Sequence, residues 1–455
     1  MMKQKEEVLM RKCIALILCL ALMTGIAACG QSKQDAPAGD GAKQESSTGN
    51  ESADAGADTD AGADSGELSG TLSILGWYSD EVAQGWIDHF NSLYPDVKVE
   101  YQYAQAVQPY MEKLQGLIMS DSAPDLILCV AENRVELVDG NMLMDLTDEH
   151  VAELMSESCK QQVLFRDRIY AVTVGGSIGG LLVNMDLWEQ AGLGEDPKTW
   201  GELVDAMHAL EKLDGVTPFI NNVTDATITI ETPLYGATWL GTDSDYEKKI
   251  ENGEKTYADY WEPIFEITKR DIYDSGLMTE ELAGLPWDTA LNNFALGQVG
   301  MIVGASWNFA DIEAINPDLN YKIMGVPNVD GTSKYYLGDC LEPSLAIMES
   351  SENKEIALAF LESLFDEESL LSNEEQVGLI GCVDGYNSIF SENPVCADAL
   401  VEGMQAGHQF MPQTYWRKNV ERMRAKYVEN VQAMLLTGRS PAECAADFDD
   451  IYNAE

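Results

Sequence analysis

Short apolar runs and amphipathic segments alternate along most of this chain, and the alternation predicts strands and helices in turn. The run 71–75 has the length and composition of a buried strand, and the segment 81–94 places Val82, Trp86 and Phe90 at helical spacing. Further strands are expected at 97–101, 125–130, 181–183, 299–303, 321–326 and 344–348, and further helices at 110–119, 200–213, 260–273, 354–365 and 419–436. Strands that alternate with helices are typical of an α/β fold, so we expect that class.

The first apolar run of the chain, 13–23, differs from the others because basic residues precede it and small residues follow it. Both candidate starts, Met1 and Met10, leave basic residues ahead of the run, as a secretory signal requires. The run is shorter than the roughly 20 residues that a membrane-spanning helix needs. The string 26–29, Ile-Ala-Ala-Cys, resembles the lipobox of bacterial lipoproteins, which implies a signal peptide at 1–28 and diacylation of Cys29.

A low-complexity stretch follows the lipobox. Residues 30–66 contain Gly, Ala, Ser, Asp, Glu, Gln and Lys almost throughout, with no aromatic side chain. Such a segment has little to bury, so 29–67 is predicted to be a lipidated cysteine followed by a disordered acidic linker. The interpretation places the rest of the chain outside the cell on a tether.

The remaining residues, about 68–455, are long for one domain by the usual prior of roughly 100 to 200 residues, so we expect two lobes. The formal net charge of -49 argues against nucleic acid as a partner, because such contacts need clusters of Lys and Arg, and we find none in the sequence. Neither CxxC nor a Cys/His cluster is found, and we expect no metal and no cofactor. The cysteines beyond Cys29 leave both disulfides and buried free thiols open; they are Cys129, Cys159, Cys340, Cys382, Cys396 and Cys444.

A set of short segments, in order and at consistent spacing, resembles the family 1 extracellular solute-binding proteins of ABC importers, the group that includes maltose-binding protein. The matching segments are 86–95, 123–127, 143–146, 169–172, 180–186, 197–203, 294–301, 304–307 and 357–361. The resemblance implies a two-lobed, type II periplasmic-binding-protein-like α/β fold, with a ligand cleft between lobes joined by a hinge. It implies lobe one at 68–179 plus 326–372 and lobe two at 180–325 plus 373–455.

The resemblance also implies a function. The chain is expected to be a monomer on the outer face of the bacterial cell membrane that captures a carbohydrate by hinge closure, without catalysis. Delivery of the sugar to the permease subunits of an ABC transporter would follow.

Candidate ligand-binding residues follow from strand ends and from the resemblance. Sugar rings need flat aromatic faces together with carboxylates, amides and hydroxyls, and residues of these types are placed near the expected cleft. They are Trp77, Tyr78, Asp80, Glu132, Asn133, Ser177, Trp239, Trp287, Trp307, Asp339 and Trp416. Trp307 is the strongest candidate, because the matching tryptophan of the family stacks on ligand. Core packing remains the alternative for the aromatic residues, and helix capping is the alternative for Glu132.

Other functions stay open at this stage. A polyamine or other cationic ligand would suit acidic residues and aromatic walls, through ion pairing and cation–π contact. An exported glycosidase would require two carboxylates at a defined separation, and no pattern isolates such a pair among the 77 acidic residues. The four His are scattered, which argues against an iron binder. A purely structural lipoprotein is disfavoured by the order of strands and helices.

Overall fold

The computed structural model describes residues 68–173, 175–223, 228–240, 243, 245–338 and 344–454. The predicted signal peptide, Cys29 and the linker to residue 67 lie outside the described residues, and so does Asp339. Within the described part of the chain, no helix combines the length and the apolar character that a membrane crossing needs. Residues Ser65–Glu455 form one compact unit by themselves.

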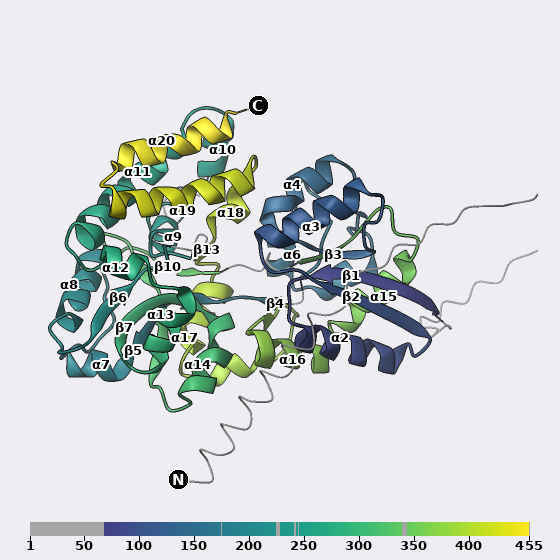
Figure 1. Ribbon diagram of the computed structural model, residues 1–455, viewed down its shortest axis with the longest axis horizontal. Helices are drawn as coiled ribbons and strands as arrows, with labels where there is room; N and C mark the ends of the chain where they lie inside the picture. Colours follow the sequence, from purple (N-terminus) through teal and green to yellow (C-terminus); the bar gives the residue numbers. More distant parts are fainter. Residues whose placement is uncertain are drawn as a thin grey trace, which may run out of the picture. The chain divides into compact units, whose positions relative to one another are not determined.

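Four strands form the first sheet, in the order β11, β3, β1, β2. They are β1 (Gly70–Gly76), β2 (Val97–Tyr103), β3 (Leu126–Cys129) and β11 (Ser344–Ile347). β1 is parallel to β2 and β3, whereas β11 runs antiparallel to β3. The parallel strands β1 and β3 therefore end at the same edge of the sheet, where residues 77–80 and 130–133 begin. Figure 1 shows α3 and α4 on one side of these strands and α2 on the other.

One buried carboxylate ties this sheet to the helix that follows β11. Asp125 accepts hydrogen bonds from the Ser73 N–H (2.8 Å) and from the Ser73 hydroxyl (2.7 Å). Its other oxygen accepts from the Ser351 hydroxyl (2.7 Å) and from Nδ2 of Asn353 (3.1 Å). Burial alone would raise the pKa of Asp125, but the hydrogen bonds from Ser351, Ser73 and Asn353 outweigh it and lower the pKa below the usual value. Asp125 therefore holds β1 and the start of α15 together.

The second sheet has β13, β10, β5, β7 and β6 in that order, and β8 and β9 pair with β5 and β10. The strands are β5 (Gly179–Asn184), β6 (Thr217–Ile220), β7 (Val299–Ala305), β8 (Tyr321–Met324), β9 (Val326–Pro327), β10 (Lys334–Leu337) and β13 (Gln409–Phe410). β5 is antiparallel to β7 and β8, and β6 is parallel to β7. Every residue of β5 and β7 is buried, as their continuous apolar sequences predict for central strands.

The chain crosses between the two sheets more than once. Two short strands lie at crossings, β4 (Gly175–Gly176) and β12 (Ile380–Gly381), and they pair antiparallel with each other. The predicted return to lobe one at residue 326 is corrected by the pairing, because β9 and β10 belong to the second sheet. The chain thus returns to the first sheet after β10 and before β11. Strand periodicity could not reveal this, since it does not specify which sheet a strand joins.

Helices cover both sheets, and the predicted helices are confirmed to within a few residues at each end. Those of the first half are α2 (Asp80–Leu93), α3 (Gln108–Met119), α4 (Ala131–Asp139), α5 (His150–Leu154), α6 (Glu157–Val163), α7 (Met185–Gln190), α8 (Trp200–Leu210) and α9 (Glu231–Tyr235). The next are α10 (Tyr246–Glu251), α11 (Tyr257–Thr268), α12 (Glu280–Ala283), α13 (Trp287–Ala295), α14 (Phe309–Ile315), α15 (Lys354–Ser363), α16 (Glu367–Val377), α17 (Ala397–Ala399) and α18 (Pro412–Tyr415). Short 3₁₀ segments are η3 (Ser306–Asn308) and η4 (Ile389–Glu392), and π-helical segments are η1 (Gly236–Leu240), η2 (Lys269–Tyr273) and η5 (Leu400–Gln405).

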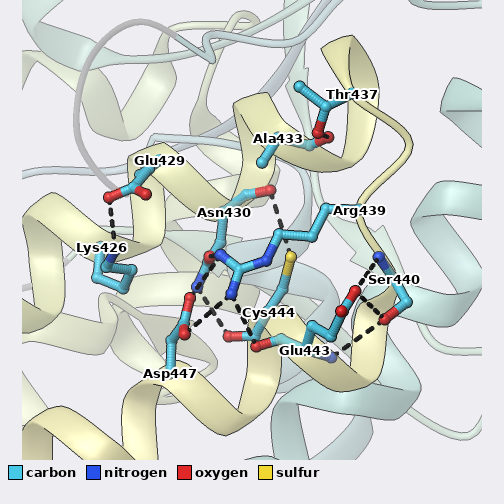
Figure 2. Close-up of polar contacts among 10 residues, drawn as sticks. All are labelled: Lys426, Glu429, Asn430, Ala433, Thr437, Arg439, Ser440, Glu443, Cys444 and Asp447. Atoms are coloured by element: carbon cyan, nitrogen blue, oxygen red, sulfur yellow. Dashed lines mark hydrogen bonds and ion pairs between the residues drawn. The ribbon is translucent and has the colours of Figure 1, made fainter.

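Two long helices, α19 (Val420–Leu436) and α20 (Pro441–Tyr452), end the chain and pack against each other and against α11. Figure 2 shows how Arg439, in the turn between them, joins the pair. Its guanidinium donates to Oδ1 of Asn430 (2.9 Å) on α19 and forms an ion pair with Asp447 (2.7 Å) on α20. Ser440 caps α20, since its hydroxyl accepts from the Glu443 N–H. The corner therefore fixes how α19 and α20 pack against each other.

Five of the six cysteines beyond Cys29 are described, and each of the five is buried. They are Cys129, Cys159, Cys382, Cys396 and Cys444. Burial raises the pKa of the Cys396 thiol to about 12 and that of Cys444 to about 11, so both are inert side chains at neutral pH. Cys340 lies outside the described residues.

Candidate functional site

The residues that follow β1 lie at the edge of the first sheet, as predicted, but their rings also serve in packing. Trp77 makes an edge-to-face contact with Tyr110 at 5.4 Å, and Tyr78 makes one with Trp86 at 4.9 Å. Both side chains remain half-buried, while Asp80 is exposed as the first residue of α2. Trp77 and Tyr78 therefore keep part of their surfaces accessible.

Asn133 holds the turn between β3 and α4. Its Oδ1 accepts from the Val130 N–H (2.9 Å), and its Nδ2 donates to the Leu128 carbonyl (3.1 Å). The side chain is buried, so its amide serves the backbone of its own turn. Asn133 is therefore a structural residue of this turn. The neighbouring Glu132 instead faces the other lobe, where it meets Arg424.

Glu132 forms an ion pair with Arg424 of α19, with 3.2 Å between Oε1 and Nη1. The Glu132 side chain is 2% exposed and that of Arg424 is 18% exposed. Two residues after Glu132, the guanidinium of Arg134 donates to the carbonyl oxygen of Thr414 (3.5 Å). The central carbon of the same guanidinium lies 4.8 Å from the ring centre of Phe165. The start of α4 thus contacts α18 and α19, so charged groups of the first lobe meet groups of the second.

A pocket of about 490 Å³ opens beside the Glu132 ion pair, and we call it the Arg424 pocket. The loop before α3 forms one wall and α19 forms the other. The lining residues are Gln105, Ala106, Val107, Gln108, Pro109, Glu132, Glu421, Arg424, Ala425 and Val428. Two carboxylates, one guanidinium and two side-chain amides therefore meet in one cavity.

A second pocket of about 330 Å³, the Arg417 pocket, has the same chemistry. Its lining residues are Gln161, Gln162, Leu164, Glu247, Gly338, Gly407, Gln409, Met411, Thr414, Tyr415 and Arg417. Arg417 pairs with Glu247 at 3.0 Å. Burial raises the pKa of Glu247, and the charge of Arg417 opposes that increase. Here too a partly buried acid and an arginine lie among glutamine amides.

Ser177 lies at the crossing beside the Arg417 pocket. It is buried, and its carbonyl oxygen accepts from Nε2 of Gln409 (2.7 Å). A Cβ on Gly338 would overlap that carbonyl oxygen, and the φ of 130° at Gly338 is also in the region that favours glycine, so both features require a glycine here. The backbone of Ser177 therefore holds Gln409 in the wall of the pocket.

Trp307 lies directly after β7 in η3, at a contact between the lobes. The preceding Ser306 accepts a hydrogen bond from the Ile178 N–H (3.4 Å) and donates from its hydroxyl to the Gly378 carbonyl (2.6 Å). Gly378 ends α16 with φ of 66°, and a Cβ there would overlap the carbonyl group of Ser306. The Trp307 ring is half-buried against the main core, which leaves part of it exposed.

The other predicted tryptophans lie apart from both pockets. Trp239 donates from its indole to the Tyr260 carbonyl (2.9 Å), and Trp287 packs against the smaller apolar core at the start of α13. Trp416 is 2% exposed and packs near Phe448, with 6.1 Å between ring centres. Trp416 has no accessible ring face here, so the structure gives it a packing role.

A larger pocket, about 550 Å³, lies elsewhere, between α14, α16 and η4. Phe309, Ile312 and Phe390 line it together with three acids, of which Glu313 and Glu375 are exposed and Glu374 is buried. Size alone does not make a polar ligand site. The two smaller pockets are the better candidates because charged and amide groups from both lobes converge there.

Sequence reasoning missed the arginines of the two pockets. Residues 417–426 contain five basic residues, which are Arg417, Lys418, Arg422, Arg424 and Lys426, in a chain with 28 Lys and Arg in total. The statement that the chain has no Lys or Arg cluster is therefore corrected. The local density of positive charge could have identified the segment, although not its acidic partners.

Comparison with known proteins identifies the class. A model of the bacterial extracellular solute-binding protein family matches residues 85–395, which is more than half of the chain, and the chain belongs to that family. The match confirms the resemblance inferred from the sequence.

Among curated relatives, a putative binding protein of Brucella abortus is 24% identical over 53% of this chain and 56% of its own length. The chain thus spans about half the length of that relative. The diacetylchitobiose binding protein DasA of Streptomyces coelicolor is 24% identical over 78% of this chain and 82% of its own.

Solved structures share the fold. A family 1 extracellular solute-binding protein from Bifidobacterium longum subsp. infantis superposes with a TM-score of 0.69 at 19% identity, covering 84% of this chain and 99% of that one. RafE in complex with raffinose gives 0.70 at 17% identity, covering 85% and 99%. The predicted two-lobed α/β fold is confirmed.

Proposed function

We propose that this chain captures a carbohydrate, an oligosaccharide, between its two lobes and presents it to the permease of an ABC transporter. The observation that carries the proposal is the chemistry of the Arg424 and Arg417 pockets. Each combines an acid–arginine pair with glutamine amides, a set of donors and acceptors that suits the hydroxyl groups of an uncharged sugar. Two proteins similar to this chain are the diacetylchitobiose binding protein DasA and RafE, which was solved in complex with raffinose.

The polyamine alternative has less support. It needs carboxylates available to an ammonium group, and one candidate, Glu132, is instead paired with Arg424. A glycosidase would need a pair of carboxylates free to act on a bond, whereas Glu132 and Glu247 are each held by an arginine. We therefore expect binding without turnover.

Capture by hinge closure is part of the proposal. The crossings at β4 and β12 would allow the lobes to rotate about a few backbone positions. Closure would bring α4 and the 414–424 segment around the ligand. Trp307, Trp77 and Tyr78 remain candidates for stacking on the sugar, because each is partly exposed.

The first test is a thermal-shift screen of the full-length chain, purified in detergent, against neutral mono- and oligosaccharides and against spermidine. A ligand that binds the folded state alone raises the melting temperature, by an amount that depends on its concentration relative to Kd. We expect an oligosaccharide to give the largest shift. A shift with spermidine and with none of the sugars would reverse the proposal.

Anchoring through Cys29 completes the proposal, with the lipid in the outer face of the cell membrane and the acidic linker as a spacer. Replacing Cys29 with Ala should release the protein into the medium or leave its signal peptide uncleaved. Detergent phase partitioning measures this directly. Unchanged partitioning of the Cys29→Ala protein would reject the anchor while leaving sugar binding intact.

A further inference from the structure

We propose that Arg417 and Arg424 set the charge selectivity of the cleft, since each neutralises a carboxylate that would otherwise attract a cation. The inference rests on the proposed function, because it concerns the surface where the carbohydrate would bind. It adds a specific role: the two arginines exclude polyamines and other organic cations from a site that is otherwise acidic.

The first pair is Glu132 and Arg424. Glu132 lies in the first turn of α4, where the helix dipole favours negative charge, and its side chain is 2% exposed. The Arg424 guanidinium lies 3.2 Å away and comes from the opposite lobe. Glu421, one turn before Arg424 on α19, lines the same pocket and is exposed. Without Arg424, the pocket would keep two carboxylates and lose the guanidinium that lines it.

The second pair repeats the arrangement in the neighbouring pocket. Arg417 places Nη2 3.0 Å from one oxygen of Glu247 and 3.3 Å from the other. Arg134 adds a further favourable charge near Glu247, whereas Glu251 acts against it. Two arginines seven residues apart thus serve two acids on different elements, α4 and α10.

The charge of the whole chain makes this arrangement consequential. A formal net charge of -49 draws cations toward the surface, and a cleft raises their local concentration further. A neutral sugar is not attracted by the negative charge of the chain, whereas competing cations are. Neutralising the carboxylates of the site therefore favours the sugar over those cations. An acid–arginine pair still offers hydrogen bonds to hydroxyl groups, and it leaves no net charge for an ammonium group to replace.

The experiment measures spermidine binding by titration calorimetry to the full-length chain in detergent. Arg424→Gln should bind spermidine about tenfold more tightly than the matched control Arg422→Gln, because coupling between close charges starts at about 1.5 kcal/mol. Arg422 is exposed on the same helix and lines neither pocket, so its replacement removes the same charge without opening an acidic site.

Two further variants identify the cause. Arg424→Lys keeps the positive charge and should stay at the wild-type affinity for spermidine. The double variant Glu132→Gln, Arg424→Gln removes the acid as well and should lose most of the gain. If Arg424→Gln does not fold, because the buried Glu132 is left without its partner, Arg417→Gln provides the same measurement at Glu247.

Equal spermidine affinity in Arg424→Gln and Arg422→Gln, or wild-type binding as tight as that of Arg424→Gln, would overturn the inference. If the wild-type protein responds to no sugar in the thermal-shift screen, the proposed function is rejected, whatever the variants show with spermidine. The two failures are distinguishable, because spermidine binding by the variants does not depend on which sugar the protein prefers.

Discussion

Individual side chains show that one residue type can serve two purposes in this protein. Trp307 and Trp416 are both tryptophans predicted to bind ligand. Trp307 follows a strand at the contact between the lobes and is half-buried, whereas Trp416 is 2% exposed within the helical core. The sequence could not separate them, since burial is decided by elements far away along the chain.

The difference predicts opposite outcomes for the same substitution. Trp307→Ala should leave the free energy of unfolding nearly unchanged and weaken sugar binding by about 2 kcal/mol or more, the loss typical of an aromatic hot spot. Trp416→Ala should lower the free energy of unfolding by about 3 to 5 kcal/mol through the cavity that it creates. Urea denaturation and calorimetry on both variants measure the two quantities. Strong destabilisation by Trp307→Ala with unchanged affinity would assign that ring to packing.

Asp125 gives a prediction in pH. Its folded-state pKa lies below the usual value, so its contribution to stability is complete above the unfolded pKa of about 3.9 and is lost as pH falls through the folded pKa. Asp125→Asn should therefore melt at a lower temperature than wild type near neutral pH, and the gap should narrow below about pH 4. Calorimetric melting between pH 3 and 7 checks this. A gap that is constant across that range would mean that the hydrogen bonds do not favour the ionised form.

At the scale of elements, the contact between η3 and Gly378, which ends α16, leaves no room for an added methyl group. Gly378 has φ of 66° and no room for a Cβ beside Ser306, while Gly438 has φ of 69° and nothing within 4 Å. The two glycines share a backbone conformation and differ in their surroundings. They therefore separate the effect of backbone strain from the effect of the interlobe contact.

Gly438→Ala should lower the free energy of unfolding by about 1 kcal/mol through strain alone. Gly378→Ala should lower it by about 1 to 3 kcal/mol more, because overlap with Ser306 adds to the strain. Chemical denaturation measures the difference. Equal losses would show that the contact between the lobes relaxes easily at this point.

Much of the fold could be predicted at this scale, because long elements carry a clear periodic signal. The strands β1, β2, β3, β5, β7, β8 and β11 and the helices α2, α3, α8, α11, α15 and α19 match the segments read from the sequence. Strands of two residues, such as β4 and β12, are too short for any periodicity. The candidate pockets were harder to predict, because Glu132 and Arg424 are distant in sequence and only the folded chain pairs them.

For the whole molecule, the proposal predicts a change of size with ligand and no chemistry. Once a ligand is known, the chain from residue 65 should show a smaller radius of gyration in solution scattering at saturation, because closure brings the lobes together. A sugar that produces no thermal shift serves as the control. Chromatography of the incubated ligand should recover it intact. Turnover that disappears on replacement of one carboxylate would instead indicate an enzyme.

The interleaving of the two sheets along the chain affects how the protein is made. β11 completes the first sheet although the other strands of that sheet, β1 to β3, end at Cys129, and β13 completes the second sheet although β5 begins at Gly179. At about 5 to 20 residues per second of synthesis, the early strands wait on the order of tens of seconds for their last partners. During that interval both sheets lack a strand. The growing polypeptide therefore remains incompletely folded until nearly all of it has left the ribosome. An unfinished chain is the form that a secretion channel can thread.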